Sequence, residues 1–217
     1  MMIEDTGKIS GNQNSKETSR IEAFSDGVFA IAITLLILEI HVPSQQANET
    51  LLNSLFHEWP HFLALLIGFF TLLVCWINHH YMFSMIHKSN SMLALINGFK
   101  LLVVTITPFA TALLSKNIQS SWEHSAVSVY CFNFALMGSA MSGIWLYSAR
   151  QGLTQTDSAK KLRAINRFYI LASILSASIW LVSYISITGS LVLSAVMFFI
   201  FIFPERIVTF LVNRNIN

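Results

Sequence analysis

Long apolar runs, separated by short polar segments, fill the chain from about residue 21 onward. Five of them hold about 20 residues with few charges, the length that a helix needs to cross the hydrocarbon core of a bilayer. They occupy residues 21–40, 61–83, 92–114, 125–147 and 167–187. A sixth run, 190–203, is shorter, ends or kinks at Pro204, and could continue through Ile207–Val212. Because lipid offers the backbone no hydrogen-bond partners, the pattern predicts an all-α protein with six transmembrane helices.

The composition excludes most soluble classes of protein. Hydrophobic residues make up 54% of the chain and charged residues 11%, whereas a typical soluble domain has roughly 25% charged residues. So few charges cannot cover a soluble surface or form a basic face for nucleic acid. We therefore predict a multi-pass protein of the cell membrane. Its expected partner is the lipid bilayer, and we expect it not to bind nucleic acid. The expected division is a mobile cytoplasmic tail at 1–19, the six-helix domain at 20–212 and a cytoplasmic tail at 213–217.

The basic residues indicate the orientation of the spans. With six spans and a cytoplasmic N-terminus, eleven lysines and arginines fall on the inside and one, Lys116, on the outside, while Lys100 lies within the third span. Cytoplasmic loops carry such an excess of positive charge. Both termini are therefore expected to be cytoplasmic. The inside set is Lys8, Lys16, Arg20, Lys88, Arg150, Lys160, Lys161, Arg163, Arg167, Arg206 and Arg214.

Polar residues inside the spans gather near one depth. Asp26 lies in span 1, the run Asn78-His79-His80 closes span 2, and Asn97 and Lys100 lie in span 3. Charges within a bilayer are costly and usually mark function. The pattern predicts one polar cluster that joins the first three spans, either as a structural lock or as a functional site. Lys100 is expected to reach cytoplasmic water along its stem.

Candidate enzyme chemistry is weak. The run from His57 to His61 imitates the zinc-protease pattern His-Glu-x-x-His, which needs both histidines on one helix. Pro60 fits the first turn of span 2 and places His57 outside it. Cys75 and Cys131 lie within apolar runs and suggest neither a disulfide nor a zinc site. We expect no enzyme activity and no cofactor.

Span 1 carries a stripe of related positions. At about 100° per residue, an arc on one face holds the span 1 stripe, which consists of Gly27, Ile31, Thr34, Leu35 and Leu38. Asp26 points away from this stripe, toward the rest of its own subunit. Taken alone, the stripe is most simply a surface for lipid or helix packing.

The start of span 1 also carries a motif. It reads Arg20-x-x-x-Phe24-Ser25-Asp26, followed by Gly-Val-Phe-Ala-Ile-Ala-Ile-Thr-Leu-Leu. This sequence closely resembles the signature of the transmembrane protein 175 family of potassium channels. One copy is present, which resembles the prokaryotic single-repeat form.

The resemblance implies a homotetramer in which span 1 of each subunit lines a central pore for potassium and other monovalent cations. It implies constrictions formed by rings of Ile31, Leu35 and Leu38, and a pore threonine layer at Thr34. The signature residues Arg20, Phe24, Ser25 and Asp26 would hold span 1 against spans 2 and 3 through a hydrogen-bond network, with Trp76, His80 and Asn97 as candidate partners. The Thr-Val-Gly-Tyr-Gly filter of other potassium channels is absent from the sequence.

Two other functions remain open from the sequence. A cation- or proton-coupled transporter could use Asp26 and His80 as a relay, which requires Asp26 to face an aqueous path. The second alternative is a scaffold protein that does not conduct ions.

Overall fold

A computed structural model describes residues 4–40 and 50–214. The regular elements of the described chain are helices, and its connections contain one isolated bridge between Ile86 and Thr154. The elements in order are α1 (Glu4–Leu35), the 3-10 helix η1 (Leu36–Glu39), α2 (Leu51–His57), α3 (Trp59–Phe83), α4 (Ser91–Asn117), α5 (Glu123–Arg150), α6 (Ala159–Ser183), α7 (Ile187–Phe201) and α8 (Pro204–Arg214).

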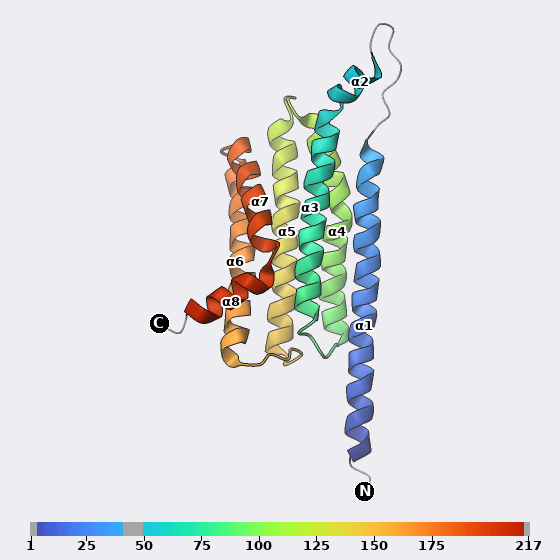
Figure 1. Cartoon of the computed structure of the whole chain (residues 1–217), viewed down its shortest axis with the longest axis vertical. Helices are drawn as coiled ribbons and strands as arrows, with labels where there is room; N and C mark the ends of the chain where they lie inside the picture. The colour runs from blue at the N-terminus through green and yellow to red at the C-terminus, as the bar shows by residue number, and fades with distance from the viewer. Residues whose placement is uncertain (1–3, 41–49, 215–217) are drawn as a thin grey trace.

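The long helices run up and down in one bundle (Figure 1). Helix α1 lies at one edge against α3 and α4, and α6 and α7 lie at the other side of α5. The connections from α3 to α4 and from α5 to α6 meet at the lower end of that view. There the backbone N–H of His87 donates to the carbonyl of Leu153 at 3.0 Å, so the two connections are joined directly.

Five helices are long and apolar enough to cross a membrane, as the sequence predicts, and α7 with α8 makes a sixth if the bent pair is one span. The chain turns by 77° between α7 and α8. Pro204 opens α8, since proline lacks the N–H that would continue α7 but fits a first helical turn. The apolar pattern at Ile207–Val212 therefore belongs to a helix that lies across the bundle (Figure 1).

Span 1 differs from the expectation at both ends. The helix begins at Glu4, so the polar segment expected as a mobile tail continues α1 without a break. At its other end α1 stops at Leu35 and tightens into η1. A 3-10 helix has three residues per turn, so residues three apart lie one above the other.

Side-chain caps fix where three of the longer helices start. Asn90 Oδ1 accepts from the backbone N–H of Leu93 at 2.8 Å at the start of α4. Ser158 and Ser186 do the same for α6 and α7. Pro60 lies in the first turn of α3, as predicted from the sequence. These caps satisfy donors that a helix start leaves free.

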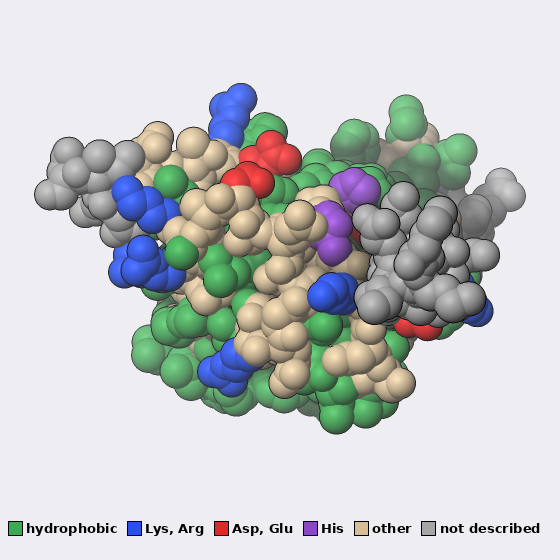
Figure 2. Space-filling view, turned by 90° about the horizontal axis from the view of Figure 1, so that it is seen from below, with side chains coloured by type: hydrophobic (Ala, Val, Ile, Leu, Met, Phe, Trp, Pro, Cys, Tyr) green, Lys and Arg blue, Asp and Glu red, His purple; other side chains and the backbone are tan. Residues whose placement is uncertain are grey.

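The basic side chains lie mainly at the lower end of the bundle. Figure 2 shows this end, where Lys and Arg side chains are spread around the face rather than gathered on one helix. Lys88 lies between α3 and α4, Arg150 closes α5, and Lys160 and Lys161 open α6. Lys116 lies at the opposite end of α4. Because cytoplasmic loops carry an excess of Lys and Arg, this distribution predicts that the lower end is cytoplasmic.

Candidate functional site

The span 1 stripe faces away from its own subunit. The exposed fractions of Ile31, Leu35 and Leu38 are 61%, 42% and 69%. On the opposite side of the same helix, Phe29 and Leu36 are almost completely buried against the bundle. The helix thus has one face packed within the subunit and a second, apolar face that the single chain leaves open.

The change from α1 to η1 aligns the outer part of the stripe. Leu35 and Leu38 are three residues apart, and at the 3-10 turn this spacing places them on the same line. Thr34 lies on the exposed side, where its hydroxyl donates to the carbonyl of Ile31 at 2.9 Å. The hydroxyl oxygen keeps lone pairs that can face a cation or water on that side.

Asp26 is held by a residue from α3. Trp76 Nε1 donates to Asp26 Oδ1 at 2.8 Å, and the ring of His80 stacks on that of Trp76 with their centroids 5.8 Å apart. The sequence predicted a buried acid, whereas Asp26 is exposed in the single chain and lies at the border between the two faces of α1. One oxygen is bound by Trp76 while the side chain stays open on its other side.

A second contact joins α1 to α4. Asn97 Nδ2 donates to Ser25 Oγ at 3.0 Å, and Ser25 Oγ donates to the carbonyl of Ile21 at 2.8 Å. Both Ser25 and Asn97 are buried. The structure therefore brings two of the four signature residues to two candidate partners, Asp26 to Trp76 and Ser25 to Asn97. The third candidate, His80, contacts the Trp76 ring instead.

The other two signature residues lie apart from these contacts. Arg20 and Phe24 line an open groove between α1 and α4, together with Asn90 and Asn97. Both are exposed, with 66% of Phe24 accessible. Within the described part of the chain, Arg20 makes no hydrogen bond or ion pair.

The single polar cluster expected across the first three spans is instead divided. Asn78 turns to the other side of α3, where its Nδ2 donates to the carbonyl of Phe201 at the end of α7 at 2.8 Å. Lys100 does not reach water: it is fully buried, with Nζ 4.2 Å from the centre of the Phe29 ring. The expectation for both residues is wrong because helix packing, and not depth alone, decides which side chains meet.

His79 and His80 point to different sides of α3, because adjacent residues on a helix lie about 100° apart. His79 is buried, with its ring 4.3 Å from that of Phe83 and 5.8 Å from that of Phe29. His80 is exposed at Trp76. Sequence reasoning missed Phe29, which touches both His79 and Lys100. Its place four residues after Ser25, on the buried side of α1, was the available signal.

The outer end of span 1 carries a charge pair. Lys116 Nζ lies 3.6 Å from a carboxylate oxygen of Glu39, and both side chains are partly exposed. Lys116 was the one basic residue assigned to the outside from the sequence. Glu39 lies in the last turn of the run 21–40, at the outer end of span 1. Their opposite charges at the same depth were the signal for this pair.

The zinc-like pattern has no shared helix. His57 ends α2 and His61 lies in α3, with the break at Glu58 between them. Within the described residues, no group of three or more His, Cys, Asp or Glu side chains is placed to hold a metal ion.

Comparisons with known proteins place these features in a family. The family model for the endosomal/lysosomal potassium channel TMEM175 matches residues 20–108, which includes the motif of α1. A protein named potassium channel from Chamaesiphon minutus is 41% identical over 177 residues, which cover 76% of this chain and 87% of that protein. A chicken protein (Gallus gallus) named endosomal/lysosomal proton channel TMEM175 is 35% identical over 144 residues, or 58% of this chain and 28% of the chicken protein.

A solved structure supports the same family assignment. The crystal structure of a lysosomal potassium-selective channel TMEM175 homolog from Chamaesiphon minutus aligns with a TM-score of 0.77 at 38% identity. The alignment covers 86% of this chain and 96% of the crystallised one. The match therefore extends over nearly the whole fold and is not confined to the motif.

Proposed function

The chain belongs to the TMEM175 family, and on that premise we propose that it is a potassium-permeable cation channel of the cell membrane. It would assemble as a homotetramer in which α1 of each subunit lines a central pore. The relative from Chamaesiphon minutus, named a potassium channel, supports this proposal because the two proteins align over most of their lengths.

One observation of the structure carries the proposal. The apolar face of α1 at Ile31, Leu35 and Leu38 is open, while hydrogen bonds and packing hold the opposite face against the subunit. A single chain cannot enclose a pore with one helix. Cyclic symmetry repeats the same stripe around an axis, and four copies would enclose a narrow channel.

The proposed gate works by excluding water. Rings of isoleucine and leucine offer an ion no ligands, so a narrow ring loses its water and blocks conduction. Conduction requires the ring to widen until a cation crosses with most of its hydration shell. Thr34 lies between the Ile31 and Leu35 levels and would supply hydroxyl oxygens in this apolar section. We therefore expect a modest preference for potassium over sodium, without a carbonyl filter.

The contacts of Ser25 and Asp26 would set the direction of the stripe. Asn97 on α4 and Trp76 on α3 bind adjacent residues of α1. Two contacts from different helices fix the rotation of α1 about its axis, which determines the side chains that face the pore. In this role the signature residues act on the pore through the position of α1.

Unitary current recordings from the purified full chain in planar bilayers test the proposal. We expect discrete current steps in symmetric potassium solution, and a reversal potential in a potassium–sodium gradient that favours potassium modestly. Ion flux without current steps would support a carrier, and absence of flux in liposomes would support a scaffold.

A second candidate is a proton-coupled or proton-conducting pathway. The contact that favours it is Trp76, which binds Asp26 and stacks on His80, so that two titratable side chains flank one indole. Among the described residues no hydrogen bond joins Asp26 to His80, so a relay would need water between them. A reversal potential that follows a pH gradient, and does not change with potassium, would favour this candidate over the potassium channel.

A further inference from the structure

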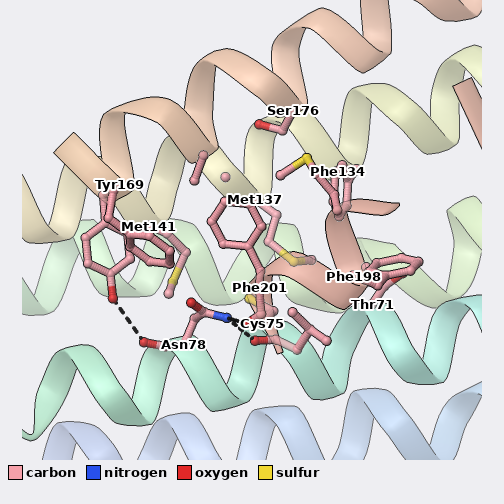
Figure 3. A pocket seen from close by; sticks show the side chains of 15 residues that line it. Thr71, Cys75, Asn78, Phe134, Met137, Met141, Tyr169, Ser176, Phe198 and Phe201 are labelled. Carbon is pink, nitrogen blue, oxygen red and sulfur yellow. Dashed lines mark hydrogen bonds between the residues drawn. The ribbon is translucent and has the colours of Figure 1, made fainter. Parts of the chain in front are cut away.

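A pocket lies inside the subunit, on the side of α3 that faces away from α1. It is formed by α3, α5, α6 and α7 (Figure 3). Its walls are mainly aromatic rings and thioethers, including Phe134, Phe198 and Phe201 together with Met137 and Met141. All four helices belong to the membrane-spanning part of the fold, so a ligand would enter from an apolar phase.

One buried polar atom of this pocket has no partner. Asn78 is 6% exposed and lines the pocket, and its Oδ1 accepts no hydrogen bond from any of the described residues. The amide nitrogen fixes the orientation of the Asn78 side chain, because Nδ2 donates to the carbonyls of Val74 and Phe201, each at 2.8 Å. Exchanging the two atoms would set Oδ1 against two carbonyl oxygens.

The hydroxyl hydrogens around the pocket are already used. Tyr169 donates to the backbone carbonyl of Asn78 at 3.3 Å, Ser176 to that of Ser173 at 3.0 Å, and Thr71 to that of Ile67 at 2.7 Å. Figure 3 shows the Tyr169 hydroxyl directed to the backbone of Asn78 rather than to its side chain. A water molecule needs two to four polar partners, and no hydroxyl around the pocket has a hydrogen left to donate to it.

We propose that this pocket binds a small uncharged phenol-type molecule, whose hydroxyl donates to Asn78 Oδ1 and whose ring packs among the aromatic and methionine side chains. The acceptor requires a donor, since a carbonyl oxygen cannot bond to another acceptor. The apolar walls exclude a charged ammonium group, because burying an unpaired charge is costly. Aromatic rings and thioether sulfurs favour an aromatic body over an aliphatic one.

Two matched probes test the site in crystals of the full chain. 4-Bromophenol carries the donor and bromobenzene lacks it, and bromine gives an anomalous signal that locates each molecule. We expect a bromine peak between α3, α5, α6 and α7 with 4-bromophenol, and its hydroxyl at Asn78 Oδ1. Absence of that peak, or a hydroxyl directed elsewhere, overturns the proposal.

Affinity in detergent gives the second measurement. Melting temperatures over a range of probe concentrations yield the two dissociation constants, and one hydrogen bond corresponds to about five- to tenfold tighter binding of 4-bromophenol. Ala172→Leu places extra carbon atoms in the pocket while leaving Asn78 in place, and we expect it to abolish binding of both probes. Equal affinity for the two probes, or unchanged binding by the folded Ala172→Leu variant, contradicts the assignment. Neither result depends on whether the chain conducts ions.

Discussion

At the scale of single residues, Trp76 is where α3 meets the motif of α1. Its indole N–H is the donor that reaches Asp26, and its ring supports His80. Replacing Trp76 by phenylalanine keeps an aromatic ring but removes the donor. We expect the loss of about 1 kcal/mol of stability, read as a lower melting temperature of the detergent-solubilised protein.

Trp122→Phe is the matched control for this change. Trp122 is 70% exposed, at the start of α5. The same loss of an indole N–H there should leave the melting temperature unchanged. Equal effects of the two substitutions would mean that the bond to Asp26 contributes nothing measurable.

The pair of Lys116 and Glu39 leads to a prediction about ion conduction. In the proposed channel Glu39 lies near the outer end of the pore, and Lys116, 3.6 Å away, offsets its negative charge. Lys116→Met removes this positive charge, and should therefore attract cations to the mouth and increase the unitary potassium current in low salt. The increase should fade toward 1 M salt, where the screening length is about 3 Å instead of about 30 Å at 0.01 M.

Lys116→Arg retains the positive charge and is expected to conduct like the original protein. A rise in current that is independent of salt, or that also occurs with arginine, would assign the effect to packing rather than to charge.

The contacts between side chains were the part of the site that the sequence predicted least well. Depth along each span is readable from sequence, which is why Asp26, Asn78 and Lys100 were expected near one level. The neighbours of a residue depend on how helices turn toward each other, and this information is long-range. Asn78 therefore contacts α7 and Lys100 lies against Phe29, although neither contact follows from the spacing within one span.

At the scale of the helix, Leu35 and Leu36 are adjacent but face opposite environments. Leu35 is 42% exposed on the stripe, whereas Leu36 is 2% exposed and packs toward Gly68 of α3. Leu35→Ala should widen the apolar ring, increase the unitary current and weaken the preference for potassium over sodium, with little change in melting temperature. Leu36→Ala removes buried atoms and should cost about 2–5 kcal/mol of stability.

Current recordings and melting curves of these two variants together test which face of α1 lines the pore. If Leu36→Ala alters permeation as Leu35→Ala does while remaining equally stable, the pore does not lie along the span 1 stripe.

Helices α5 and α6 approach closely at Gly138, which gives a prediction about packing. A Cβ atom at this position would lie 2.5 Å from Ser176 Oγ and 3.2 Å from its Cβ, so the Ser176 hydroxyl would have to turn away and its Cβ give way slightly. Gly138→Ala should therefore lower the stability by about 1–3 kcal/mol. Gly143→Ala, on the same helix with nothing within 4 Å of the added atom, should be neutral or stabilising in the same melting assay. Equal melting temperatures for the two variants would show that the α5–α6 contact adjusts at no cost.

The helices themselves were largely predictable. Runs of apolar residues gave five long spans because each must cover the whole hydrocarbon core, and Pro204 marked the break between α7 and α8. The sequence could not give the angle of 77° at that break, which depends on what α8 packs against. Nor did it show the 3-10 turn from Leu36, since the residues there suit an α-helix equally well.

At the scale of the whole molecule, the proposed pore requires several copies of the chain. One subunit has a mass of 24.4 kDa. We expect native mass spectrometry of the detergent-solubilised protein to give a particle close to four times that mass, because four stripes are needed to enclose the axis. A monomer, or a dimer that conducts with full activity, would exclude this arrangement.

The short helix α7 has a consequence for the surrounding lipid. Its 15 residues rise by about 22 Å, whereas the hydrocarbon core of a bilayer is about 30 Å thick. Beyond Phe201 the chain turns sideways into α8, so it does not supply the missing length. We therefore expect the lipid headgroups beside α7 to be drawn together locally, at a small cost that grows with each ångström of mismatch. Bilayer thickness should then act on this side of the protein, and lipids with shorter acyl chains are expected to collect next to α7.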